Sequence, residues 1–153
     1  MLGDGNGWVH HNHTKYWGLH GAAGLFLVAG GRALMQHRAA WTAQGGTWGI
    51  PGGARDSHES ASEAALRETV EECAIDVSEV TVTGELVTFS VPGWSYTTVL
   101  ARADRPLRVT ANEESEELRW VPLDEIAALP LHPGFAASLP ALVQAVVHTE
   151  PHD

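Results

Sequence analysis

The sequence predicts one domain of the α/β or α+β class, because strand-like and helix-like segments alternate along its 153 residues. Two observations carry this prediction. An apolar run at Ala22–Ala29 is followed by Gly30-Gly31 and a second strand-like run. A stretch rich in helix-forming residues then extends through 53–75 without a proline. The sequence contains no repeat and no domain boundary after the first 17 residues, so we expect one domain at 18–153.

The first 17 residues are rich in glycine and histidine and show neither helical nor strand periodicity. We therefore expect residues 1–17 to form a flexible or loosely packed N-terminal arm. The arm contains three aromatic side chains that we expect to anchor it to the domain: Trp8, Tyr16 and Trp17.

The first half of the domain is predicted to contain a β-hairpin and a short strand. The apolar Ala22–Ala29 run indicates a strand buried on both faces, and Gly30-Gly31 is typical of a two-residue turn into Arg32–Arg38. A glycine-bearing loop at 41–47 precedes a short strand at 48–53, which breaks at its glycines. Those glycines would let the backbone approach another group closely. No Gly-Lys-Ser/Thr follows them, which excludes a P-loop.

The second half of the domain is predicted to contain further strands and two helices. The expected elements are β-rich segments at 79–92 and 95–103, a strand at 118–121, a short helix at 122–128 and an amphipathic helix at 138–148. A polar link at 104–112 and an acidic run at 112–117 precede the strand, and a loop at 131–135 precedes the last helix.

The helix predicted within 53–75 has two chemically different sides. Ser57 or Ser60 can cap its start. At about 100° per residue, one side contains Ala65, Leu66, Thr69 and Cys73. Cys73 is the only cysteine, and we expect a buried apolar residue rather than a nucleophile. The opposite side contains three carboxylates, those of Glu68, Glu71 and Glu72.

Three carboxylates on one side of a helix repel each other, at roughly 0.2–0.5 kcal/mol for each i, i+4 pair. Hard oxygen ligands of this kind suit Mg²⁺ or Mn²⁺, which also bind substrate phosphates. The simpler interpretation is a solvated acidic helix face. The net charge of −10 argues against a nucleic acid polymer or an anionic membrane as partner. A phosphate-bearing substrate would meet the same repulsion unless bound cations offset it.

The spacing of residues around the acidic helix favours the metal-site interpretation. The segment 53–75 carries, at the spacing that their numbers give, Gly53, Glu59, Arg67, Glu68, Glu71, Glu72 and Ile75. It resembles the signature box of the Nudix hydrolases, which cleave a nucleoside diphosphate linked to another group. Ala74 stands where the box has a glycine, and Thr69 stands where an aliphatic residue is usual. If residue 74 must be left-handed, the alanine costs about 1 kcal/mol.

The resemblance implies a fold, a reaction and a set of site residues. The fold is a mixed β-sheet sandwiched between helices, and the reaction is Mg²⁺-dependent hydrolysis of a phosphoanhydride, with Mn²⁺ as a substitute. The implied metal ligands are the carbonyl of Gly52 and the carboxylates of Glu68, Glu71 and Glu72. Arg67 and Glu59 would pair and orient these ligands. The general base would be a box glutamate or one from 113–117, where Glu114 or Glu116 could ligate a further metal.

The substrate is predicted only as a class. A nucleoside triphosphate or an oxidised relative ranks first, followed by ADP-ribose or a dinucleotide. The candidate substrate-binding residues are Arg38, Trp48, Gly53 and Glu114. The nucleobase of the substrate could also stack on Trp94, Tyr96 or Phe135.

Another function class stays open on the sequence: a non-catalytic, nucleotide-binding regulatory protein of the same fold. Such proteins usually lose box glutamates, whereas all three are present here. A calcium-binding structural domain would need an Asp-rich twelve-residue loop, which the sequence lacks. Because the chain has no signal-like start and no apolar run near about 18 residues, we expect a cytoplasmic protein. The sequence leaves a homodimer open.

Overall fold

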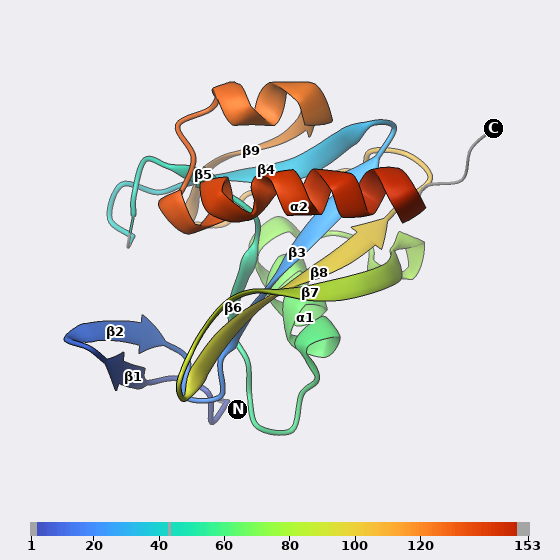
Figure 1. Ribbon diagram of the computed structural model, residues 1–153. Helices are drawn as coiled ribbons and strands as arrows, with labels where there is room; N and C mark the ends of the chain where they lie inside the picture. The colour runs from blue at the N-terminus through green and yellow to red at the C-terminus, as the bar shows by residue number, and fades with distance from the viewer. Residues whose placement is uncertain (1–2, 43, 150–153) are drawn as a thin grey trace.

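The computed structural model describes residues 3–42 and 44–149, in which a mixed β-sheet lies between two helices (Figure 1). The strands are β1 Trp8–His11, β2 Thr14–Trp17, β3 Ala22–Ala29, β4 Arg32–Arg38, β5 Trp48–Gly49, β6 Gly52–Ala54, β7 Thr81–Val91, β8 Trp94–Arg102 and β9 Ser115–Pro122. The α-helices are α1 Ala61–Cys73 and α2 Pro133–Thr149, and the short 3-10 helices are η1 Val77–Glu79 and η2 Leu123–Ala128. None of the described helices combines the length and the apolar character needed to cross a membrane.

Strand β3 lies at the centre of the sheet because its residues are apolar and buried along its whole length. On one side it runs parallel to β8, which pairs antiparallel with β7. On the other side the end of β3 pairs with β4, whereas its beginning pairs with β6. Strand β4 continues away from β3 and pairs instead with β5 and β9. The sheet therefore divides between β4 and β6.

Each face of the sheet packs against one α-helix. The α2 face contains, among others, Phe26, Met35, Phe135 and Leu142. The α1 face contains, among others, Leu25, Leu34, Ala65 and Cys73. Consecutive residues of β3 and β4 enter opposite cores, as the alternation of side chains in a strand requires. These two cores confirm the predicted sheet between helices and the buried position of Cys73.

The predicted hairpin turn is confirmed at Gly30 and Gly31, whose φ angles of 57° and 73° require the freedom of glycine. Other predicted boundaries were wrong. The strand expected at 48–53 is interrupted before Gly52, because proline at 51 cannot donate to a strand ladder. Strand β9 begins at Ser115, inside the acidic run, because its pairing with β4 extends that far. Helix α2 begins at Pro133, in the segment expected to be a loop.

The described part of the predicted arm, residues 3–17, contains the β1–β2 hairpin. Tyr16 stacks on Trp94 with ring centroids 4.9 Å apart, and the backbone N–H of Gly5 donates to Asp56 Oδ1 at 2.9 Å. Trp8 and Trp17 instead contact each other and stay about two-fifths exposed. Residues 1 and 2 lie outside the described residues, and the looseness of the arm stays a prediction.

Candidate active site

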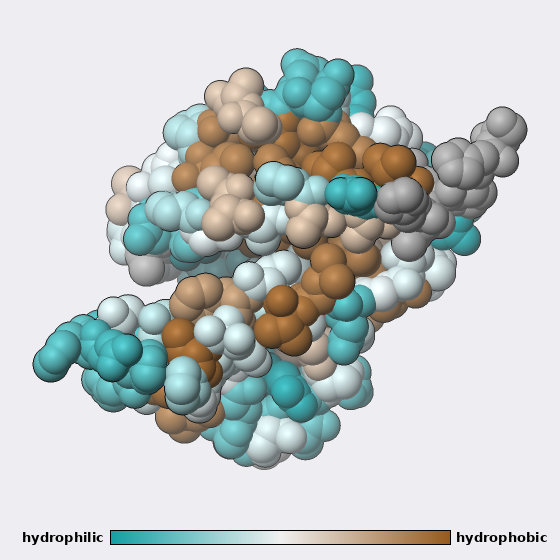
Figure 2. Space-filling view, viewed as in Figure 1, coloured by the Kyte–Doolittle hydropathy of each residue, from teal (hydrophilic) through white to brown (hydrophobic). Residues whose placement is uncertain are grey.

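A cleft of about 1250 Å³ opens where β4 and β6 part. In Figure 2 it is the recess between the N-terminal hairpin and the part of the molecule that carries α2. The residues of the acidic helix that line it are Arg67, Glu68, Glu71 and Glu72. Side chains from distant segments also line it, including Tyr16, Gln36, Arg38, Glu114, His132 and Phe135.

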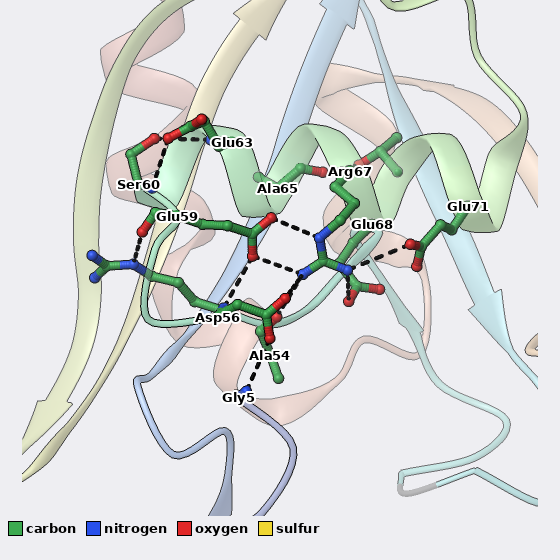
Figure 3. Close-up of polar contacts among 12 residues, drawn as sticks. Gly5, Ala54, Asp56, Glu59, Ser60, Glu63, Ala65, Arg67, Glu68 and Glu71 are labelled. Carbon is green, nitrogen blue, oxygen red and sulfur yellow. Dashed lines mark hydrogen bonds and ion pairs between the residues drawn. The ribbon is translucent and has the colours of Figure 1, made fainter. Parts of the chain in front are cut away.

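Helix α1 has a defined cap at each end. Ser60, rather than Ser57, is the N-cap: its Oγ accepts from the Glu63 N–H, and the Glu63 carboxylate accepts from the Ser60 N–H (Figure 3). This reciprocal pair is a capping box. At the other end Ala74 is left-handed, with φ 57° and ψ 36°. The alanine at the glycine position of the box therefore carries a backbone cost of about 1 kcal/mol.

Arg67 and Glu59 form the predicted pair. Arg67 donates from Nε to Glu59 Oε2 at 2.7 Å and from Nη2 to Glu59 Oε1 at 2.9 Å, a two-pronged contact visible in Figure 3. Nη2 also donates to the carbonyl of Ala54 at 3.1 Å. Ala54 follows Gly52 and Gly53, which form the glycine corner of β6. The hydrogen bonds from Arg67 to the Glu59 carboxylate lower the pKa of Glu59, although its almost complete burial acts in the opposite direction. Arg67 thereby ties α1 to the segment that precedes it.

The same arginine also contacts two of the acidic side chains. Arg67 Nη1 lies 3.0 Å from Glu68 Oε1 and 3.5 Å from Glu71 Oε1. Burial raises the pKa of Glu68, although Arg67 opposes part of that effect. Glu71 is much more open to solvent, with a side chain 56% exposed. Arg67 thus occupies part of the acidic surface that the sequence predicted as a metal site.

Glu72 lies deepest of the three glutamates and is only 4% exposed. Its Oε1 accepts from Gln36 Nε2 at 3.0 Å, and its Oε2 accepts from the Gly52 N–H at 3.2 Å. Burial raises the pKa of Glu72 to about 8, with a further contribution from the negative charge of Glu68. Both oxygens accept hydrogen bonds from N–H groups, which favours the ionised carboxylate. Burial has the opposite effect and disfavours its charge.

Glycine is required beside these carboxylates. A Cβ on Gly53 would lie 2.6 Å from the carboxyl carbon of Glu68, and a Cβ on Gly52 would lie 2.4 Å from the carbonyl oxygen of Ala23. The backbone at Gly53 therefore approaches the acidic side of α1 more closely than a residue with a side chain would allow. Within 3–42 and 44–149, no three His, Cys, Asp or Glu side chains are already arranged to hold a metal ion.

The other predicted binding residues have different locations. Arg38, Gly53 and Glu114 line the cleft, and the charge of Glu114 is close enough to raise the pKa of both Glu68 and Glu72. Trp48, which was predicted to bind substrate, does not line the cleft: its ring lies in the core between His37 and the Arg119 guanidinium. Glu116 accepts weakly from the Ala40 N–H, 3.5 Å away, outside the cleft lining.

Several polar residues of the cleft were not predicted from the sequence, among them Gln36, Asp56 and His132. Gln36 is 2% exposed, and the signal for it was a polar residue directly after the apolar run 33–35 of β4. Asp56 Oδ2 lies 3.7 Å from Arg67 Nη2, and its other oxygen accepts from the N-terminal segment. His132 lies just before α2, where burial lowers its pKa. No sequence pattern marks these last two residues.

Comparison with known proteins places this geometry in a family. The family model described as NUDIX domain matches residues 18–142. A Mycobacterium tuberculosis protein named "Putative 8-oxo-dGTP diphosphatase 3" is 52% identical over 149 residues, which span 90% of this chain and 69% of that protein. The crystal structure of a Nudix hydrolase from M. smegmatis, RenU, matches with a TM-score of 0.92 and 46% identity, over 97% of this chain and 99% of that one.

A C. elegans Ap4A hydrolase, with a TM-score of 0.68 and 22% identity over 83% of this chain and 98% of that one, shares the fold. The similarity to the mycobacterial proteins covers at least 90% of this chain, far beyond the 53–75 segment. Sequence and fold agree, and the chain belongs to the Nudix hydrolase family.

Proposed function

We propose that this protein hydrolyses a phosphoanhydride bond in a nucleoside diphosphate linked to another group, using Mg²⁺, with Mn²⁺ as a substitute. The observation that carries the proposal is the burial of two carboxylates, Glu68 and Glu72, beside the glycine corner of a large cleft. Burial raises the pKa of both, so their negative charge lacks an adequate counter-charge from the protein. A bound divalent cation would provide that counter-charge.

The donor set fits a hard cation. Carboxylate and carbonyl oxygens are what Mg²⁺ and Mn²⁺ prefer, and the residues that would hold the ion are Gly52, Glu68, Glu71 and Glu72. Arg67 would release Glu68 and Glu71 while keeping its two-pronged contact with Glu59. The bound cation would supply neutralisation of phosphoryl charge and activation of water. The acidic protein could then accept an anionic substrate.

The remaining cleft residues suggest roles around the diphosphate. Arg38 lies at the end of β4 on the cleft and would contact a phosphate. The general base would be a box glutamate or Glu114, whose charge acts on Glu68 and Glu72. A nucleobase would pack against the apolar and aromatic wall near Phe135, since Trp48 is buried elsewhere.

The first substrate class to test is a nucleoside triphosphate or an oxidised relative, because the M. tuberculosis relative is named for 8-oxo-dGTP. ADP-ribose and dinucleotides follow. The experiment incubates the protein with each class, with MgCl₂ or with EDTA, and measures phosphate, pyrophosphate and the nucleotide products. We expect release from one class with Mg²⁺, loss of release with EDTA and recovery with excess Mg²⁺ or Mn²⁺. Ligand-induced thermal stabilisation without any product would identify a regulatory binder and contradict the proposal.

A further inference from the structure

Gln36 is a polar residue in an apolar environment. It lies on β4 after two fully buried apolar residues, Leu34 and Met35, and it is itself only 2% exposed. By strand alternation its side chain shares the α1 face of the sheet with Leu34, opposite the face of Met35. Burying an amide costs free energy unless hydrogen bonds replace those made with water. A leucine would satisfy the packing, so the amide needs another explanation.

The amide nitrogen of Gln36 makes two hydrogen bonds. It donates to Glu72 Oε1 at 3.0 Å and to Ser115 Oγ at 2.8 Å. Beside a bound cation Glu72 would be ionised and could only accept, so the nitrogen of Gln36 rather than its oxygen must then face Glu72. The same nitrogen therefore binds both Glu72 and Ser115, which lies at the start of β9. Glu72 on α1 and Ser115 on the sheet together set the orientation of the Gln36 amide by binding its nitrogen.

This orientation leaves Gln36 Oε1 buried without a hydrogen-bond partner among the described residues. An orphaned buried acceptor is uncommon and costs stability, so its presence indicates that another requirement sets the orientation of the amide. The requirement visible here is the N–H donor that Gln36 presents to Glu72.

We propose that Gln36 is a positioning residue, which holds the Glu72 carboxylate from β4 in the orientation that binds a divalent cation. Glu72 is fixed at its other oxygen by the Gly52 N–H, so donors from the two strands that part at the cleft hold one carboxylate. Groups that orient a metal-ligating carboxylate in this way commonly change metal affinity or activity by about 10–100-fold when they are removed. The inference rests on the proposed function, because it takes Glu72 as a cation ligand.

The test measures Mn²⁺ binding to the full chain without any nucleotide, from the EPR signal of free Mn²⁺. Gln36→Leu removes both donors while keeping most of the volume, and we expect its Mn²⁺ dissociation constant to rise by about 10–100-fold. Ser115→Ala removes only the second hydrogen bond of the Gln36 amide nitrogen, and we expect a smaller rise of the Mn²⁺ dissociation constant. The matched control is Thr69→Val, which removes a buried hydroxyl that bonds to the Ala65 carbonyl on α1. It should keep wild-type affinity.

Two results would overturn the inference in distinguishable ways. If wild type binds Mn²⁺ and both Gln36→Leu and Ser115→Ala bind it equally well, Gln36 has a structural role only and the proposed function survives. If the wild-type chain fails to bind Mn²⁺, the inference and the proposed function fall together. Should Gln36→Leu fail to fold, Ser115→Ala with unchanged affinity is sufficient to reject the inference.

Discussion

Arg67 connects the two charged parts of the site. Its guanidinium makes parallel hydrogen bonds to the buried Glu59 and also reaches Glu68 and Glu71. A lysine keeps the charge but cannot make the two-pronged contact. We expect Arg67→Lys to lower the free energy of unfolding by about 1–3 kcal/mol, because one oxygen of Glu59 loses its donor.

Urea denaturation measures this change. The control is Arg105→Lys, which alters an ion pair with Glu79 on the exposed surface and should change stability by less than about 0.5 kcal/mol. An equal change in the free energy of unfolding of the two variants would contradict the role given to the two-pronged contact between Arg67 and Glu59.

Glu72 makes the stability of the metal-free protein depend on pH. Its pKa is about 8 in the folded chain and near 4.5 in an unfolded one, so the folded state holds the extra proton between those values. The protonated Glu72 therefore contributes to the free energy of unfolding in full below pH 4.5, and this contribution is lost as pH rises through about 8. In EDTA, we expect the unfolding free energy of wild type to fall across this range relative to Glu72→Gln. Parallel profiles for the two proteins would show that Glu72 titrates normally.

The sequence predicted the charged residues of the site better than its neutral ones. Helical spacing alone placed Glu68, Glu71 and Glu72 on one side of α1, and the structure puts all three on the cleft. It could not show that Glu72 is the most buried of them, because that depends on β4 and β6 packing above the helix. For the same reason Trp48 was assigned to the site and Gln36 was missed: burial is decided by segments distant in sequence.

Among the elements, α1 carries an unfavourable residue at its end. Ala74 has the left-handed conformation that glycine adopts without a steric cost. We expect Ala74→Gly to raise the free energy of unfolding by about 1 kcal/mol, measured by urea denaturation. The same change at Ala141, an exposed position within α2, should lower it by about 0.5–1 kcal/mol. Destabilisation by both substitutions would contradict the strain assigned to Ala74.

The order of elements was predictable, whereas several of their boundaries were not. The β3–β4 hairpin and α1 follow from local patterns: an apolar run with a Gly-Gly turn, and a capped helix without proline. Strand β9 extends into an acidic run only because β4 offers it a pairing partner. Helix α2 begins at Pro133, since proline suits the first turn of a helix, although the Leu131–Phe135 stretch resembles a loop.

For the whole molecule, the decisive feature is the division of the sheet between β4 and β6. It places the glycine corner of β6, the acidic side of α1 and the end of β4 around one cleft. The N-terminal hairpin adds a further wall, held through Tyr16 and Gly5. This wall could not be predicted, because short aromatic strands without periodicity resemble an unstructured arm.

The central claim is that the acidic side of α1 binds the cation needed for hydrolysis. Its most direct test is the kcat of Glu72→Gln with MgCl₂ on the best substrate, beside Glu63→Gln on the same helix. Glutamine at 63 can still form the capping box, so that variant should keep wild-type kcat. We predict at least a ~100-fold fall for Glu72→Gln with the fold retained. Wild-type kcat in Glu72→Gln, or an equal loss in Glu63→Gln, would contradict the claim.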